Sequence, residues 1–317
     1  MMTMRIAAAQ VHGAWLDPVR TTEIVTDWIG RAADEDVELV AFGETFLGGY
    51  PLWLSITDGA RFDDAGQKAA YAAYLDAAVE IDGPEVSTII EAARDRHVFT
   101  YLGAAERGKG PGRGTVYCTL LAIDPERGLL SAHRKLMPTH EERMAWGIGD
   151  GQGLRVHDGP GGVQVGGLNC WENWMPLART AMYAGGEDLH VAVWPGAVTH
   201  TQDITRFIAR EGRVFVLSAG TLISAADIPS SFPLAEAVIA NMDEGSYDGG
   251  SCIAGPDGHW IVAPVANEER LVMADIDLAR VHEERHNFDP TGHYSRPDVL
   301  ELTVRRRRLA TVEFDDR

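Results

Sequence analysis

Short apolar runs alternate with amphipathic stretches along most of the chain, and these two patterns predict strands and helices in turn. A hairpin signal joins 251–254 to 260–263 across a Gly-Pro-Asp-Gly turn. We expect further strands at 6–11, 37–42, 99–103, 115–123, 129–135, 163–168, 189–194, 214–219 and 271–276. We expect helices at 21–33, 67–79, 84–96, 176–184 and 202–212, with Thr21 or Thr22 as the first N-cap.

The order of these elements favours one fold class. The chain contains two successive series of alternating strands and helices, with many strands in total. This order suits a layered α/β sandwich better than one continuous doubly wound sheet. Because no repeat and no Pro/Ser-rich linker divides the sequence, we predict a single domain over residues 1–317. The connection 225–250 holds only one short helix-like piece, and so long a connection is usually functional. We interpret it as a candidate substrate-gating loop.

Composition and charge narrow the classes of function. An apolar fraction of 45% is ample for a packed core, and no stretch has the length of a membrane span. A net charge of −19 argues against nucleic acid or an anionic membrane as the partner. The arginine run 305–308 opposes this trend, and we interpret it as a solvated or inter-subunit ion-pairing surface. The N-terminus lacks a signal-peptide pattern, which predicts a cytoplasmic protein.

Cys170 is the most informative single residue. It follows the apolar run 163–168 and precedes a helix that Pro176 opens. Backbone N–H groups at such a junction favour the thiolate, which is the nucleophilic form of cysteine. The alternative is a buried core thiol, since free cysteine is among the most buried residue types. Cys118 and Cys252 lie within strand-like runs, where the core interpretation is the better one.

Two further strand ends carry groups that would give Cys170 partners. Only three of the 28 basic residues are lysines, and Lys135 is a lysine placed beside an arginine at the end of a strand-like run. Glu44 directly follows another apolar run, where a carboxylate is costly unless it is paired. A carboxylate base, a thiolate and an ammonium together can perform nucleophilic acyl-type chemistry.

A Cys–His pairing of the protease kind is the main chemical alternative. Neither of the cysteine-protease signatures matches the residues around Cys170, and lone histidines are more often structural. The histidines that could in principle serve are His133, His140, His190, His200 and His293.

Several segments in the same order resemble the nitrilases of the carbon–nitrogen hydrolase superfamily. Glu…Lys…Cys alone would indicate only the superfamily, whereas Trp171-Glu172 after the cysteine and the Gly-Asp-Gly loop at 149–151 are typical of the nitrilase branch. The segments are 42–51, 133–143, 146–151 and 170–177, with 292–299 near the C-terminus.

This resemblance implies a four-layer αββα sandwich and a Glu–Lys–Cys triad. It assigns Glu44 as general base, Lys135 as transition-state stabiliser and Cys170 as nucleophile, and it places the family's second glutamate on Glu142 rather than Glu141. It implies hydrolysis of an organic nitrile to the carboxylic acid and ammonia through a thioimidate, with no metal and no organic cofactor. It also implies a homo-oligomer, for which we expect the C-terminal extension from about residue 283 to provide contacts.

The substrate and the closest rival activities stay open at this stage. An amidase, a carbamoylase or a nitrile- or cyanide-hydrating enzyme would share the triad, and a non-catalytic scaffold would keep only the fold. An apolar, aromatic-lined pocket would suit aromatic or arylaliphatic nitriles, although several of the aromatic residues are equally expected in the core. The candidates for this pocket are Tyr50, Trp53, Trp146, Trp171, Trp174 and Trp194.

Overall fold

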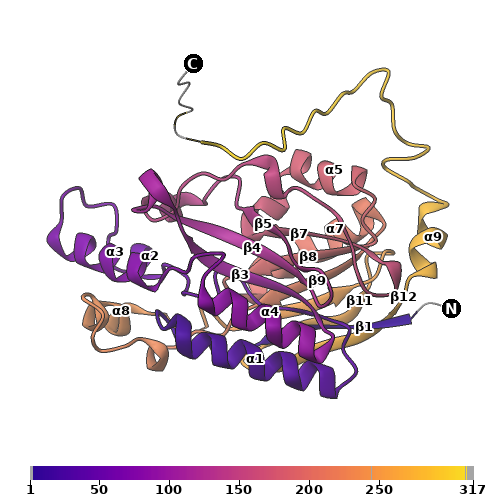
Figure 1. Cartoon of the computed structure of the whole chain (residues 1–317). Coiled ribbons are helices and arrows are strands. Elements are labelled where there is room, and N and C mark those ends of the chain that lie inside the picture. Colours follow the sequence, from indigo (N-terminus) through magenta and orange to yellow (C-terminus); the bar gives the residue numbers. More distant parts are fainter. Residues whose placement is uncertain (1–2, 244, 311, 313–317) are drawn as a thin grey trace.

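Two six-stranded β-sheets lie face to face in the part of the chain that the computed structural model describes, residues 3–243, 245–310 and 312 (Figure 1). Each sheet has a parallel centre and antiparallel flanks. The first sheet has the order β12 (Arg270–Asp277), β1 (Thr3–Gln10), β2 (Leu39–Ala41), β3 (Phe99–Arg107), β4 (Val116–Asp124) and β5 (Gly128–Arg134). The second has the order β11 (Trp260–Ala266), β10 (Gly249–Ala254), β9 (Phe215–Gly220), β8 (Leu189–Trp194), β7 (Gln164–Asn169) and β6 (His157–Asp158).

Helices cover the outer face of each sheet. Side chains alternate between the two faces of a strand, so Ile6 and Leu39 face the opposite sheet, whereas Ala7 and Val40 pack under helices. The layer order helix–sheet–sheet–helix confirms the predicted αββα sandwich (Figure 1). The covering helices are α1 (Pro18–Asp34) and α4 (Pro84–Arg96) on the first sheet, and α5 (Pro176–Ala184) and α7 (Ile204–Gly212) on the second.

Further elements lie at the two ends of the sandwich (Figure 1). The remaining α-helices of the described residues are α2 (Trp53–Ile56), α3 (Ala65–Ala77), α6 (Val198–Thr201), α8 (Ala235–Asn241) and α9 (Ala279–Arg285). Of these, α2, α3 and α8 lie at one end and α9 at the other. The 3-10 turns are η1 (Gly110–Gly112), η2 (His140–Met144), η3 (Gly151–Gly153), η4 (Pro160–Gly162), η5 (Cys170–Trp174) and η6 (Ala225–Asp227).

The first helix begins earlier than the sequence pattern predicted. Its N-cap is Asp17, whose carboxylate accepts a hydrogen bond from the backbone N–H of Arg20, and Pro18 occupies the first helical position. The prediction of Thr21 or Thr22 as the cap is wrong, because both lie inside the helix and donate their hydroxyls to backbone carbonyls behind them. The helix predicted at 202–212 is α7, preceded by the separate short helix α6.

Beyond α9 the chain continues as an irregular extended segment that returns to its own fold (Figure 1). Arg308 forms an ion pair with Asp150 at 3.3 Å, so this part of the 305–308 run binds its own chain. The backbone N–H of Leu309 donates to the same carboxylate at 3.0 Å. No helix within the described ranges is long and apolar enough to cross a membrane.

Candidate active site

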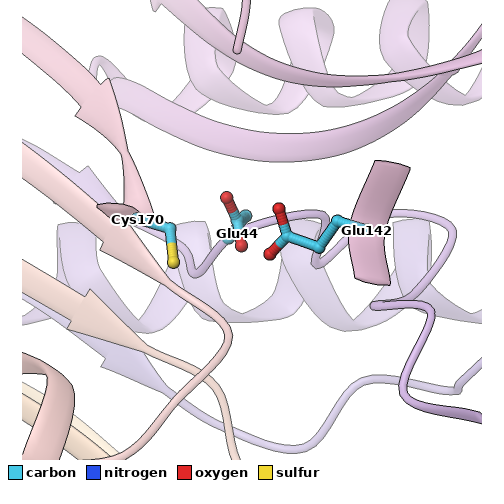
Figure 2. A group of neighbouring side chains, drawn as sticks. All are labelled: Glu44, Glu142 and Cys170. Carbon is cyan, nitrogen blue, oxygen red and sulfur yellow. The ribbon is translucent and has the colours of Figure 1, made fainter. Parts of the chain in front are cut away.

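The ends of three strands from the two sheets bring Glu44, Lys135 and Cys170 together. Glu44 lies shortly after β2, Lys135 directly follows β5, and Cys170 directly follows β7. The carboxyl ends of parallel strands are the usual place for sites in α/β folds. Figure 2 shows Glu44 between Cys170 and Glu142, and one ligand atom from each of these three residues lies within 4.8 Å of the other two.

The Lys135 ammonium links the two carboxylates. Its Nζ donates to Glu44 Oε1 at 2.9 Å and to Glu142 Oε2 at 2.7 Å, with the lysine only 1% exposed. Burial works to lower the pKa of Lys135, but the Cys170 sulfur, when it is a thiolate, and the carboxylates of Glu44 and Glu142 outweigh burial and hold the pKa well above its ordinary value. The ammonium is therefore a permanent positive charge inside the site.

Glu44 is a carboxylate whose proton affinity is matched to neutral pH. Burial raises its pKa to about 7, against the attraction of Lys135 and with the help of repulsion from Glu142. The Cys118 thiol contacts Glu44 Oε1 at 3.4 Å. A general base works best when its pKa lies near the working pH, so Glu44 has the properties that the predicted role requires.

The state of Cys170 differs from the sequence expectation of a favoured thiolate. Burial raises the pKa of the Cys170 thiol well above its ordinary value, and the Glu44 carboxylate adds to the shift. Lys135 and the backbone N–H of Trp171 lower it, but the short turn η5 provides too little positive potential to outweigh burial. Cys170 consequently rests as a thiol and needs a base before it can attack. Its φ of 45° is in the left-handed region, a strained conformation typical of functional residues.

Glu142, and not Glu141, faces the triad. Glu142 Oε2 accepts a hydrogen bond from the backbone N–H of Thr139 at 2.6 Å, and Tyr50 donates its hydroxyl to Glu142 Oε1 at 3.0 Å. The Glu141 side chain is 33% exposed and pairs with His140 instead. The geometry thus gives Glu142 the position of an orienting partner for Lys135.

The grouping of Glu44, Glu142 and Cys170 would also be chemically able to ligate a metal ion. The Lys135 ammonium is hydrogen-bonded to both carboxylates, so a metal ion would have to displace the charge that already balances them. The residues present fit an ammonium better than a metal, and the expectation of a metal-free site stays a prediction.

Glu172 is a structural partner that the sequence reasoning did not assign. Its carboxylate accepts hydrogen bonds from the backbone N–H of Leu136 at 2.8 Å and of Asn169 at 2.9 Å, and from His133 Nε2 at 2.9 Å. These contacts join the strand ends that carry Lys135 and Cys170. Burial works to raise the pKa of Glu172, but the His133 imidazole and the backbone donors lower it. The capping-box spacing of Asn169 and Glu172 was the available signal.

A second buried carboxylate–histidine pair supports the nucleophile from the other side. Asn173 Nδ2 donates to the Cys170 carbonyl at 2.9 Å, and its Oδ1 meets His190 Nε2 at 2.8 Å. His190 Nδ1 contacts Glu187 at 3.0 Å. His133 contacts Glu172, and His190 contacts Asn173, so both histidines support the backbone around Cys170 rather than its thiol. In the described part of the chain Cys170 makes no hydrogen bond with a histidine. The Cys–His protease alternative therefore lacks its defining contact.

The cavity beside Cys170 has a volume of about 370 Å³ and a wall of mixed polarity. Tyr50 and Trp171 line it, with Tyr247 from the predicted gating connection. Trp53, Trp146 and Trp194 are at most 4% exposed and pack in the core outside this wall. Trp146 still contacts the site, because its ring lies 5.2 Å from Lys135 Nζ, and substrate binding by these aromatic residues stays a prediction. His200 also lines the cavity.

Comparison with known proteins identifies the family. The family model described as carbon-nitrogen hydrolase matches residues 5–286. The chain is 34% identical to an aliphatic nitrilase of Rhodococcus rhodochrous, over 98% of this chain and 85% of the relative. It is 36% identical to a bifunctional nitrilase/nitrile hydratase of Nicotiana tabacum, over 98% and 89%.

The fold is also similar to that of a solved carbon-nitrogen hydrolase. The crystal structure of a carbon-nitrogen hydrolase from Helicobacter pylori matches 93% of this chain and 96% of that chain with a TM-score of 0.68 and 15% identity. With the matching family model, the near full-length relatives and the clustered Glu44, Lys135 and Cys170, the chain belongs to the carbon-nitrogen hydrolase family.

Proposed function

We propose that the protein is a nitrilase, which hydrolyses an organic nitrile to the carboxylic acid and ammonia. The observation that carries this proposal is the buried Lys135 ammonium shared by Glu44 and Glu142 beside the Cys170 thiol. The near full-length similarity to nitrilases supports the choice of nitrile within the family.

The first half of the reaction forms a covalent intermediate. Glu44 takes the thiol proton as Cys170 Sγ bonds to the nitrile carbon, and the proton passes to the nitrile nitrogen. The product is a thioimidate on Cys170. Lys135, itself 1% exposed, stabilises the negative charge that develops on the substrate.

The second half consumes two waters. Glu44 removes a proton from the first water as its oxygen bonds to the thioimidate carbon, and the nitrogen is protonated and leaves as ammonia. A thioester remains, and a second water activated by Glu44 releases the carboxylic acid and regenerates the thiol. Because every proton returns to one carboxylate, a single general base with a pKa near 7 serves all steps.

The group that leaves the tetrahedral intermediate decides whether the product is the acid or the amide. If nitrogen leaves, the acid forms, whereas if sulfur leaves, the enzyme releases the amide. The tobacco relative is named a bifunctional nitrilase/nitrile hydratase, so amide release is the second candidate function. Glu142 accepts a hydrogen bond from Lys135, as Glu44 does, and so helps to fix where the stabilising charge lies during this choice.

A panel of aliphatic, aromatic and arylaliphatic nitriles and their amides tests the proposal, with acid, amide and ammonia each quantified. We expect acid and stoichiometric ammonia from at least one nitrile, and loss of turnover by several powers of ten in Cys170→Ala. Faster turnover of the amides than of the nitriles would make the protein an amidase. Full activity of Cys170→Ala would end the thioimidate mechanism.

We further propose that the protein is a homo-oligomer in which the C-terminal extension contributes contacts. Its support is the exposure of apolar residues on that segment, such as Leu300 at 76% and Leu309 at 66%. Sedimentation of the full chain measures the assembly, and a monomer at micromolar concentration would contradict this proposal.

A further inference from the structure

A second, much smaller cavity lies against Glu44. Its volume is about 20 Å³, and its lining includes Glu44, Thr45 and Thr221. This is enough space for one water molecule, which needs roughly 10–15 Å³ by the same kind of measure. Tyr50 lines both this cavity and the larger one beside Cys170, so the small cavity adjoins the active site.

Three oxygens on residues that line the small cavity lack hydrogen-bond partners among the described residues. They are Glu44 Oε2, Thr45 Oγ1 and Thr221 Oγ1. The three residues are 1%, 0% and 5% exposed, so bulk water does not reach them. Buried polar atoms are almost always hydrogen-bonded, and three such atoms on one cavity require a common explanation.

The local backbone supports a specific role for the two hydroxyls. Thr45 has a φ of 45°, which is a genuine outlier for a β-branched residue. A side chain at Gly43 would bring its Cβ within 2.0 Å of Thr221 Oγ1, so the glycine leaves the space that this hydroxyl occupies. The chain thus carries a strained threonine and a glycine on either side of the base.

We propose that this cavity is a binding site for one resident water molecule, which positions the Glu44 carboxylate. The water donates one hydrogen to Glu44 Oε2 and the other to one threonine hydroxyl, and it accepts a hydrogen bond from the second threonine. All three oxygens are then satisfied, within the two to four polar partners that a buried water normally has. Its consequence for turnover rests on the proposed function, whereas its existence does not.

The water occupies the side of Glu44 that other groups leave free. Lys135 and Cys118 both contact Oε1, which leaves Oε2 to the cavity. A donor to Oε2 favours the charged carboxylate and so opposes the effect of burial on the Glu44 pKa. The titratable groups that act on or are acted on by Glu44 are Lys135, Glu142, Cys118, Cys170, Tyr50 and Tyr74.

A high-resolution crystal structure of the full chain tests the site directly. We expect one ordered water within hydrogen-bonding distance of Glu44 Oε2, Thr45 Oγ1 and Thr221 Oγ1. A dry cavity, or one closed by direct contacts among these oxygens, would overturn the proposal.

Difference infrared titration tests the effect on the base, with Glu44→Gln identifying the carboxyl band. Thr45→Val and Thr221→Val remove a hydroxyl with little change in shape, and together they leave the water only one of its three proposed partners. We expect the midpoint of Glu44 to rise on the order of one pH unit in the double variant, and less in each single variant. An unchanged midpoint in folded Thr45→Val/Thr221→Val would overturn the positioning role.

Matched controls separate this role from general destabilisation. Thr45→Ser and Thr221→Ser keep the hydroxyls and should restore the parental midpoint. Thr100→Val removes a buried hydroxyl of β3 that bonds to the Val98 carbonyl, and it should leave the Glu44 midpoint unchanged. With an accepted nitrile, the double variant should lower kcat about tenfold with KM nearly unchanged. The infrared result stands even if nitriles are not the substrate, so the two proposals fail separately.

Discussion

Glu44 and Glu172 are buried to the same extent, 1% exposed each, yet their surroundings move the two pKa values in opposite directions. Glu172 meets two backbone N–H donors and His133, and its pKa is lowered. Glu44 has Lys135 and Cys118 on one oxygen and is repelled by Glu142, and burial raises its pKa to about 7. Burial alone therefore does not decide the role of a carboxylate. The neighbouring donors and charges do, because Glu172 meets only donors and an imidazole whereas Glu44 is also repelled by the Glu142 carboxylate.

The largest effect that tests this contrast is on turnover. Glu44→Gln keeps the shape but removes the base, so we expect kcat on a good nitrile to fall roughly 10²–10⁴-fold. Steady-state kinetics with ammonia detection measures it. Glu23→Gln on the exposed side of α1 is the matched control and should keep kcat. A loss in Glu44→Gln no larger than in that control would remove Glu44 from the mechanism.

Glu172→Gln should act on stability first. The amide has one acceptor oxygen where the carboxylate has two, so at least one of the donors at Leu136, Asn169 and His133 is left without a good acceptor. We expect the free energy of unfolding at pH 7 to fall by about 1–3 kcal/mol. Denaturant unfolding gives this quantity. Unchanged stability together with a loss of kcat as large as that of Glu44→Gln would erase the distinction between the two carboxylates.

Glu44 and Glu172 should contribute in opposite directions to the pH dependence of the free energy of unfolding. The folded pKa of Glu44 lies above its unfolded value, so its stabilising contribution is present below about pH 4.5 and is lost as pH rises to about 7. The folded pKa of Glu172 is depressed, so its contribution is present above the unfolded pKa and is lost as pH falls through the folded one. Unfolding measured from acid pH well below 4.5, where the Glu172 contribution is lost, up to pH 8 should show each slope disappear in the matching glutamine variant. Identical slopes in both variants would contradict the assignment.

The smallest effect concerns Tyr50. Its hydroxyl donates to Glu142, which in turn holds Lys135. Tyr50→Phe removes one neutral-to-charged hydrogen bond two contacts away from the reacting atoms, so we expect kcat/KM to fall about three- to tenfold. If instead Tyr50→Phe matched Glu44→Gln in its loss, the hydroxyl would have to contact the substrate directly.

Local sequence patterns were sufficient to predict the catalytic candidates and the start of the first helix. Glu44 and Cys170 each follow an apolar run and Lys135 ends a strand-like one. Because such strand ends meet in a layered fold, the proximity of the three residues was predictable. The start of α1 was locally encoded as well, because Asp17-Pro18 is an N-cap followed by a first-turn proline, but two nearby threonines offered a competing signal.

Contacts between segments that are far apart in the sequence could not be predicted from local patterns. The approach of Thr221 to Gly43 joins residues far apart in the chain, and no spacing rule reports it. The state of Cys170 was misjudged for the same reason, since burial and the Glu44 charge are tertiary properties that outweigh the local turn. Which aromatic side chains line the cavity likewise depends on packing, and of the six aromatic residues that the sequence offered only Tyr50 and Trp171 do so.

The most direct test of Glu44 as the base is the pH dependence of kcat/KM for an accepted nitrile. Because Glu44 must be deprotonated to take the thiol proton, kcat/KM should rise with pH and level off above a midpoint near 7 in the parent protein. The residual activity of Glu44→Gln should lack this midpoint. A rise with the same midpoint in Glu44→Gln would show that another group is the base and would contradict the account.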